Sequence, residues 1–192
     1  IFLFIMDETP EVSGELILDQ THISNASMIH DLQQKGYGEI EKNQLLLKQF
    51  ETLYLLYTNK LVLKKNKKQI DFDSYMSICQ KTNSEILTKF LIFRDLKTRG
   101  YIVKDGFGFG SDFRVYERGH FGEKGAKFLI FGFNEGQQEK IGTLQNNIVE
   151  ITQMGKEPII AVIERRGEVI YYKINKMNFF ENKARLDDSF EF

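Results

Sequence analysis

The chain has 192 residues, of which 42% are hydrophobic and 28% are charged, and its formal net charge is −1. This composition excludes the class of chains that stay disordered, and the length suffices for one large domain or two small ones. The balanced charge excludes a global field that attracts nucleic acid, so any RNA contact must come from local patches. The single cysteine, Cys79, excludes an internal disulfide and a cysteine-rich metal site, and we expect a cytoplasmic protein with no metal or other cofactor.

The first part of the chain contains short apolar runs. Residues 1–6 are apolar but are followed by Asp7 and Glu8, well short of the ~20 residues of a membrane span. We therefore expect a short buried strand there and no contact with a membrane. Up to about residue 40, turn residues break the apolar runs, and this pattern predicts small strands joined by turns. These residues are Pro10, Gly14, Gly36 and Gly38.

Apolar residues at helical spacing predict three helices between residues 46 and 100. The second follows the acidic residues Asp71 and Asp73, and the third is predicted to begin near Ser84 and to end at Gly100. The predicted buried faces are Leu46, Phe50, Leu53, Tyr54 and Tyr57 in the first helix, Phe72, Tyr75, Met76 and Cys79 in the second, and Leu87, Phe90 and Leu91 in the third.

Between the first two helices, residues 60–68 read Lys-Leu-Val-Leu-Lys-Lys-Asn-Lys-Lys. One interpretation is a patch that contacts phosphates, and the other, which is the commoner meaning of such a run, is a strand followed by a solvated basic turn. The sequence leaves both open.

From Tyr101 onward the pattern changes to strands, interrupted by one helix at about residues 139–154. We therefore predict an α+β N-terminal domain at residues 1–83 and an α/β C-terminal domain at residues 84–192, with a mixed sheet and flanking helices. The predicted strands are 101–103, 113–116, 128–133, 159–163 and 169–174.

Residues 106–110 read Gly-Phe-Gly-Phe-Gly and superficially suggest a phosphate-binding loop. The glycines fall at every second position, and no lysine–serine pair follows, so a nucleotide site is disfavoured. Alternating glycines instead predict an extended segment with all glycines on one face.

Several segments together resemble the signature of archaeal tRNA-intron (tRNA-splicing) endonucleases. They are Leu96–Lys104, Phe109–Gly119, Ile159–Glu164 and Gly167–Tyr172, with weaker likeness around Gly36–Gly38 and Phe50–Leu55. The resemblance covers nearly the whole chain. It implies an endonuclease-like C-terminal domain and, as substrate, precursor tRNA with a bulge-helix-bulge motif.

The resemblance also implies a metal-free reaction in which the 2′-hydroxyl attacks the scissile phosphate, leaving a 2′,3′-cyclic phosphate and a 5′-hydroxyl. In the family a tyrosine is the general base, a histidine the general acid, and a lysine stabilises the transition-state charge. Tyr116 lies at the tyrosine position of the Phe-Arg-x-Tyr-Glu-Arg-Gly motif, and Lys156 lies at the lysine position.

The histidine position departs from the family pattern. Active members carry a His-Ser pair there, and this chain has Gly125 and Ala126. His120 lies five residues earlier; it is either a substitute acid in a rearranged loop or an ordinary exposed loop residue. Two further departures are Val149, where active members tend to carry an arginine, and Pro158 at the start of the strand that follows Lys156.

Other residues receive roles only through the resemblance. We assign RNA contacts to Arg114, Arg118 and Lys127, and subunit assembly to Glu135 and Glu139, which lie where the family uses an acidic loop to enter a basic pocket of a facing subunit. Without the family context, the loop is an ordinary polar connection.

The leading hypothesis is a structural subunit, without its own catalytic histidine, in a heterotetramer of two catalytic and two structural chains. The first alternative is an active endonuclease that uses Tyr116, His120 and Lys156. The second alternative is a non-catalytic RNA-binding module, which the balanced charge disfavours.

Overall fold

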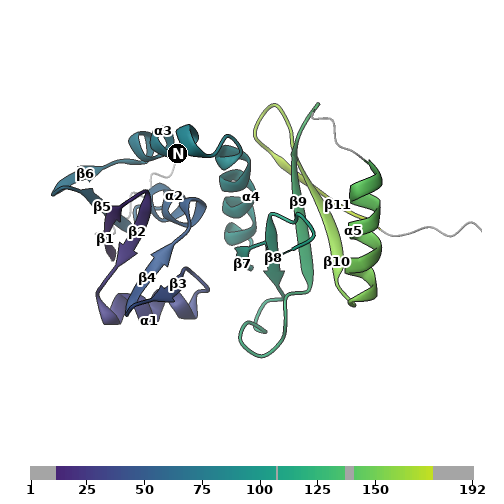
Figure 1. The fold of residues 1–192 in the computed structure, drawn as a ribbon, viewed down its shortest axis with the longest axis horizontal. Helices are drawn as coiled ribbons and strands as arrows, with labels where there is room; N and C mark the ends of the chain where they lie inside the picture. Colours follow the sequence, from purple (N-terminus) through teal and green to yellow (C-terminus); the bar gives the residue numbers. More distant parts are fainter. Residues whose placement is uncertain (1–11, 107, 137–140, 175–192) are drawn as a thin grey trace, which may run out of the picture.

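The structure is a computed structural model that describes residues 12–106, 108–136 and 141–174. The strand predicted at residues 1–6 lies outside these ranges. Two domains lie side by side, each built on its own sheet, with helix α4 (Ile86–Thr98) between them (Figure 1). The predicted fold class, an α+β domain followed by a mixed sheet with flanking helices, is confirmed.

The N-terminal sheet has six strands in the order β3-β4-β2-β1-β5-β6. Strands β1 and β5 are parallel, and the other neighbours are antiparallel. Burial alternates strictly along β1, as expected for a strand with one face on the core. The strands are β1 (Val12–Ile17), β2 (Gln20–Ile23), β3 (Glu39–Glu41), β4 (Gln44–Leu47), β5 (Leu61–Lys65) and β6 (Lys68–Ile70).

Helices α1 (Ala26–Gln34), α2 (Gln49–Tyr57) and α3 (Phe72–Thr82) complete this domain. Helix α1 was not predicted, because its apolar stripe is short: Leu32 is buried, and Met28 and Ile29 pack partly buried against the core. The Asn25 side chain caps the helix. Helix α2 begins later than predicted, since Leu46 belongs to β4. Helix α3 agrees with its prediction and buries the single cysteine, Cys79.

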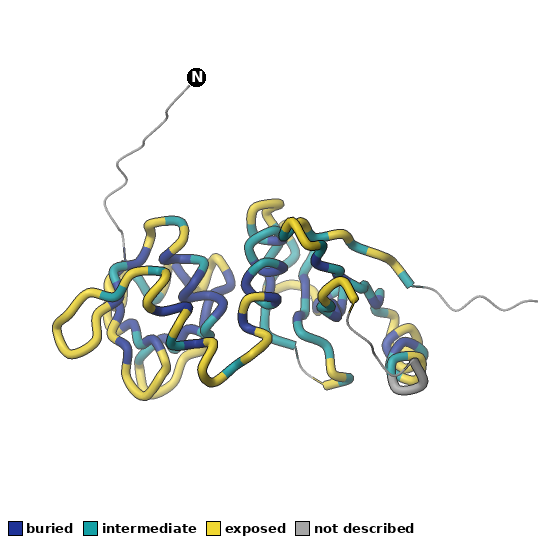
Figure 2. The backbone as a smooth tube through the Cα atoms, turned by 90° about the horizontal axis from the view of Figure 1, so that it is seen from above, coloured by how far each residue is buried: buried dark blue, intermediate teal, exposed yellow. Residues whose placement is uncertain are grey.

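Helix α4 packs against both domains. The Phe93 ring lies 4.9 Å from that of Phe50 in α2, and Phe50 lies 5.1 Å from Phe113 in the C-terminal sheet, so one hydrophobic core runs through both domains. The prediction that Leu87 is buried is wrong: its exposed fraction is 46%, because α4 turns this position away from the core. Buried segments line the seam between the domains in Figure 2.

The C-terminal sheet has five strands in the order β11-β10-β9-β8-β7. Helix α5 (Ile141–Gln153) connects β9 to β10, and these two strands are parallel, while the other neighbours are antiparallel. Helices α4 and α5 lie on opposite faces of the sheet (Figure 1). The strands are β7 (Ile102–Asp105), β8 (Phe113–Tyr116), β9 (Phe128–Asn134), β10 (Glu157–Ile163) and β11 (Val169–Lys173).

The glycine-rich segment between β7 and β8 differs from its prediction. Gly108, Phe109 and Gly110 all have positive φ angles, of 74°, 54° and 66°, so the chain turns instead of running extended. A Cβ at Gly106 would lie 1.8 Å from the Ser111 carbonyl oxygen, which explains the glycine at this close approach. Phe107 lies outside the described residues.

A polar seam joins the domains beneath the shared core. The buried Glu51 carboxylate accepts hydrogen bonds from the backbone N–H groups of Gly38 and Lys48, at 3.0 Å and 2.8 Å. Burial raises the pKa of Glu51 to about 7, against the opposing effect of these donors and of Lys104 and Lys97. The two lysines belong to β7 and α4, and the Lys104 ammonium donates to the Gly38 carbonyl at 2.7 Å. The seam therefore ties the C-terminal domain to residues of the N-terminal one.

Candidate active site

The candidate site lies at one end of the C-terminal sheet. Val115 of β8 lies opposite Phe128 of β9, which in turn lies opposite Glu157 of β10. One step beyond this row come Tyr116 on β8 and Lys156, which directly precedes β10. Since neighbouring strands lie ~4.8 Å apart, the two Cα atoms are about 10 Å apart across the intervening strand. The strand order therefore brings together two residues that are far apart in the sequence.

Lys156 lies beside Gly125, where the family resemblance predicts a histidine in active members. Its ammonium donates a hydrogen bond to the Ala126 carbonyl oxygen at 2.7 Å. A Cβ built on Gly125 would lie 3.8 Å from the Lys156 Nζ, an ordinary van der Waals contact, and no other atom lies within 4 Å of it. Position 125 thus borders Lys156 and has room for a Cβ atom.

Tyr116 is half-buried, and its ring meets that of Phe121 edge to face, with the centroids 5.0 Å apart and the planes at 89°. Phe121 belongs to the loop between β8 and β9, which hangs below the sheet in Figure 1. This contact was not predicted, because an aromatic pair across an irregular loop has no periodic signature in the sequence.

His120 lies in the same loop. Its Nδ1 is 3.9 Å from a Glu123 carboxylate oxygen, too far for a hydrogen bond, and this buried nitrogen has no hydrogen-bond partner. Among the hydrogen bonds and ion pairs of the described residues, His120 has none with Tyr116 or Lys156. The structure therefore does not join the three candidate catalytic side chains.

The predicted RNA-binding residues make contacts within the chain. The Lys127 ammonium donates a hydrogen bond to the Glu117 carboxylate and lies 4.0 Å from the Glu157 carboxylate. The hydrogen bond between Lys127 and Glu117 raises the pKa of Lys127 and lowers that of Glu117. Arg114 donates to the Asp105 carbonyl oxygen at 3.0 Å, and Arg118 donates to that of Arg99. The Arg118 guanidinium also lies 5.0 Å from the Tyr101 ring centroid. Their assignment to RNA stays a prediction.

Glu135, one of the two residues assigned to assembly, lies in the turn after β9. Its carboxylate Oε2 is 3.6 Å from the Arg165 Nε and accepts a hydrogen bond from the Arg165 backbone N–H at 3.2 Å. Glu139 lies outside the described residues. The acidic loop is thus tied, at Glu135, to the turn between β10 and β11.

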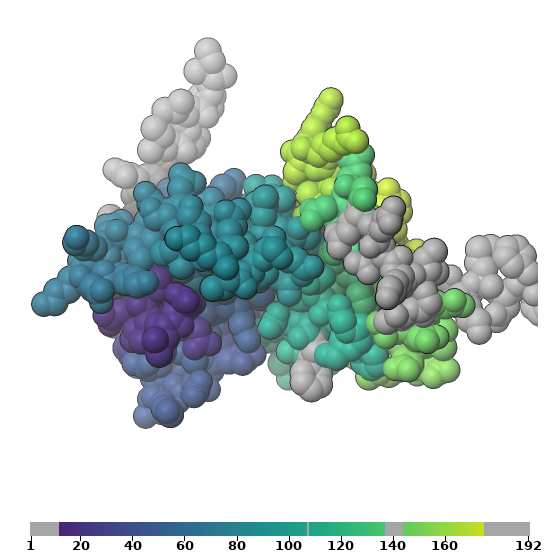
Figure 3. All heavy atoms as spheres, turned by 45° about the horizontal axis from the view of Figure 1, so that its top comes forward, coloured from purple at the N-terminus to yellow at the C-terminus, as the bar shows by residue number. Residues whose placement is uncertain are grey.

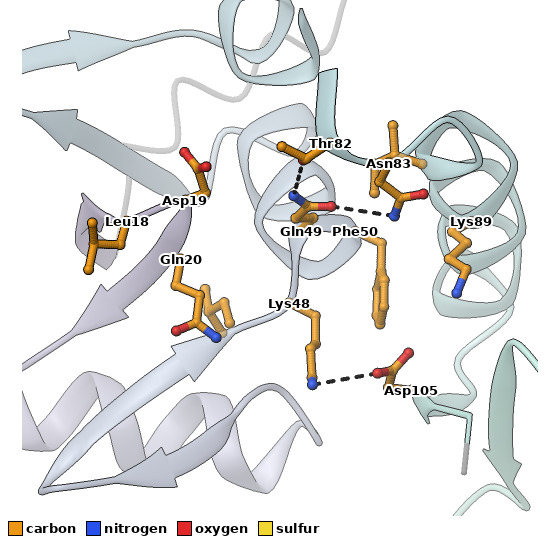
Figure 4. Close-up of a pocket in the computed structure, with 12 residues that line it drawn as sticks. Leu18, Asp19, Gln20, Lys48, Gln49, Phe50, Thr82, Asn83, Lys89 and Asp105 are labelled. Atoms are coloured by element: carbon orange, nitrogen blue, oxygen red, sulfur yellow. Dashed lines mark hydrogen bonds and ion pairs between the residues drawn. The ribbon is translucent and has the colours of Figure 1, made fainter. Parts of the chain in front are cut away.

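A hollow of about 510 Å³ lies between the domains and is distinct from this site. Figure 4 shows Lys48 pointing toward Asp105 across it, with the charged atoms 3.5 Å apart. Tyr116, His120 and Lys156 do not line it.

Residues 12–106, 108–136 and 141–174 contain neither a candidate membrane span nor a candidate metal site. No helix there has the length and apolar character needed to cross a membrane. Likewise, no three histidine, cysteine or carboxylate side chains in those ranges gather into a group suited to a metal ion.

Comparison with known proteins identifies both domains. Residues 12–76 match the family model described as the tRNA intron endonuclease N-terminal domain, and residues 86–171 match that of the tRNA intron endonuclease catalytic C-terminal domain. The chain is 35% identical over 147 residues to the tRNA-splicing endonuclease of Methanococcus maripaludis, covering 76% of this chain and 83% of the relative. It is 28% identical over 165 residues to that of Pyrococcus furiosus, covering 86% and 89%. With both domains matched in order and most of each relative covered, the chain belongs to the tRNA intron endonuclease family.

Proposed function

We propose that this chain is the structural subunit of a tRNA-splicing endonuclease, which removes introns from precursor tRNA together with a histidine-bearing catalytic subunit. One observation carries the proposal. Tyr116 and Lys156 are present at one end of the sheet, whereas position 125, which borders Lys156, is a glycine. The site thus has residues for the base and for charge stabilisation but no acid beside them.

The chemistry explains why the missing group matters. Attack by the 2′-hydroxyl expels the 5′-oxygen, which leaves as an unstable alkoxide unless a general acid protonates it. Such an acid contributes ~10²- to 10⁴-fold to the rate.

Assembly has a candidate surface in β11. This strand is an edge of the C-terminal sheet, and its Ile170 and Tyr172 side chains are 36% and 52% exposed. An exposed edge with apolar side chains is suited to pairing with a second chain. We infer a complex of two structural and two catalytic subunits, in which Glu135 contributes to contacts between subunits, acting on a bulge-helix-bulge RNA.

The test is cleavage of a bulge-helix-bulge precursor tRNA by the purified chain, scored for a 2′,3′-cyclic phosphate. We expect no cleavage by the chain alone and cleavage when a histidine-bearing family member is added. Efficient cleavage by the chain alone refutes the structural role.

A second candidate is an active endonuclease with His120 as the acid. The observation that favours it is the buried His120 Nδ1 without a hydrogen-bond partner, in the loop that reaches Tyr116 through Phe121. His120→Ala would then abolish cleavage, and His30→Ala, which removes an exposed histidine of α1, would leave it unchanged.

A further inference from the structure

The hairpin of β5 and β6 concentrates positive charge at the outer end of the N-terminal domain. Residues 60–70 contain five lysines and no acidic residue, in a chain whose net charge is −1. All five are exposed, and the hairpin forms the outermost end of the molecule in Figures 1, 2 and 3. We call Lys60, Lys64, Lys65, Lys67 and Lys68 the lysine hairpin.

Little of this charge is balanced close by: Glu15 of β1 lies opposite Lys64 of β5 in the sheet, but no ion pair joins them among the described residues. Lys48, Lys89, Lys127 and Lys173 each have a carboxylate within 4.0 Å. No member of the lysine hairpin belongs to any ion pair among the residues described. Lys65 even lies directly opposite Lys68 across the two strands, a like-charge pair that destabilises a hairpin. A bound polyanion would relieve this repulsion.

The turn at its tip keeps a lysine where glycine is usual. Asn66 and Lys67 have φ angles of 51° and 66°, the left-handed conformation of a two-residue hairpin turn that favours Asn-Gly. Lysine at the second position carries a steric cost that glycine would avoid. The Lys67 side chain is thus exposed at the tip of the hairpin.

The outer face of the sheet provides a hollow beside the hairpin. Its volume is about 400 Å³, and Lys64 and Lys67 line it together with Ser13, His22, Ser24 and Asn25. The His22 Nδ1 donates to the Gln44 side-chain carbonyl at 2.8 Å, which fixes the ring at the wall of the hollow. Glu15 is the single acidic residue in the lining. The lining thus offers two ammonium groups and several neutral polar groups to an anion.

We propose that the lysine hairpin and this hollow bind the sugar-phosphate backbone of the RNA substrate, away from the end of the sheet that carries Tyr116 and Lys156. The inference rests on the proposed function for the identity of the RNA. Residues 60–70 contain no aromatic residue and no arginine, so they lack the groups that stack on bases or recognise them with paired donors. Lysines act on phosphates as point charges, and the contact is therefore independent of base sequence.

The test compares variants of the full chain in which two lysines are replaced by neutral glutamines. Lys64→Gln with Lys67→Gln removes both lysines of the hollow. The matched control is Lys42→Gln with Lys81→Gln, which also removes two exposed, unpaired lysines; Lys42 likewise lies in a hairpin turn with a positive φ of 48°. The dissociation constant for an intron-containing precursor tRNA is measured by fluorescence anisotropy over a salt series, for the chain alone and for its complex with a histidine-bearing subunit.

We expect the hairpin variant to bind on the order of tenfold or more weakly at moderate salt, and the slope of log K against log salt to fall by about 1 to 2. The control should bind like the wild type, and the thermal midpoints of all three should agree, because the substituted side chains are exposed. Equal binding by the hairpin variant and the control overturns the inference.

Three further outcomes are separable. Binding and partner-dependent cleavage by the wild type, with no effect of the hairpin substitutions, removes this inference and leaves the proposed function standing. A wild type that neither binds the RNA nor supports cleavage in either form removes both. A variant that keeps RNA binding but loses its association with the catalytic subunit shows a protein-docking surface, which also overturns the RNA contact.

Discussion

Replacing Gly125 with histidine should give this chain cleavage activity of its own. The backbone at position 125 is outside the left-handed region, and a Cβ there meets only the Lys156 ammonium, at 3.8 Å. The Cβ of a histidine is therefore accommodated beside Lys156, at the same end of the sheet as Tyr116. The substitution is made alone, because Ala126 is 8% exposed and a serine there would bury a hydroxyl group.

The size of the expected gain follows from the role of the group. A general acid contributes ~10²- to 10⁴-fold, equivalent to about 3 to 5 kcal/mol of activation free energy. A histidine placed without its evolved surroundings should reach the lower part of this range. The assay is single-turnover cleavage of a bulge-helix-bulge precursor tRNA, with the 2′,3′-cyclic phosphate as product.

Three controls isolate the effect. Gly125→Ala adds the Cβ without the ring and should remain at the wild-type rate. Adding Lys156→Met to the histidine variant should abolish the gain, whereas adding His120→Ala should leave it intact. A folded Gly125→His variant that binds the RNA and cleaves no faster than Gly125→Ala would show that Tyr116 and Lys156 are not arranged for catalysis.

The remaining predictions concern stability. Burial raises the pKa of Glu51 from 4.5 to about 7. Between these two pH values, Glu51 is protonated in the native state and ionised in the unfolded chain. The free energy of unfolding should therefore fall by about 3 kcal/mol as the pH rises from 4.5 to about 7. Glu51→Gln should remove this component, which chemical denaturation at a series of pH values will detect; parallel pH profiles of the two proteins would contradict it. Gly132→Ala in the central strand β9 should cost about 1 to 3 kcal/mol, because its Cβ would lie 2.5 Å from Cδ1 of the fully buried Ile92 of α4. Thermal unfolding measures this against Gly125→Ala, whose added Cβ meets no core atom, and equal midpoints would refute the packing argument.

Periodic apolar segments were the predictable part of the fold. Helix α3 and strands such as β8 and β9 stand close to their predicted ranges, because each buries one regular face. Helix α1 escaped prediction because its apolar stripe has only three residues, Met28, Ile29 and Leu32, among many polar ones. The turn at Gly108–Gly110 was misread because alternation fits an extended strand equally well, and only the packing of Ser111 against Gly106 decides the path.

The candidate site was predictable to a lesser degree. Tyr116 and Lys156 were found through motif resemblance, but their proximity depends on β9 lying between β8 and β10, which the sequence does not specify. The buried Glu51 was missed altogether. It reads as one acidic residue in an amphipathic helix, and its role appears only when residues 35–38, α4 and β7 are packed around it.

Cys79 gives the chain a built-in reporter of its own opening. Cys79 is 1% exposed, and burial raises the pKa of its thiol to about 11. Alkylating reagents therefore cannot easily reach the sulfur, and only a small fraction of it is the reactive thiolate. Modification must therefore proceed through states in which helix α3 has left the core. Because the chain has no second cysteine, one mass increment counts the opened molecules, and the labelling rate measures the opening free energy. Comparing that rate in the free chain and in an assembled complex will show how far assembly stabilises the N-terminal domain, without any engineered probe.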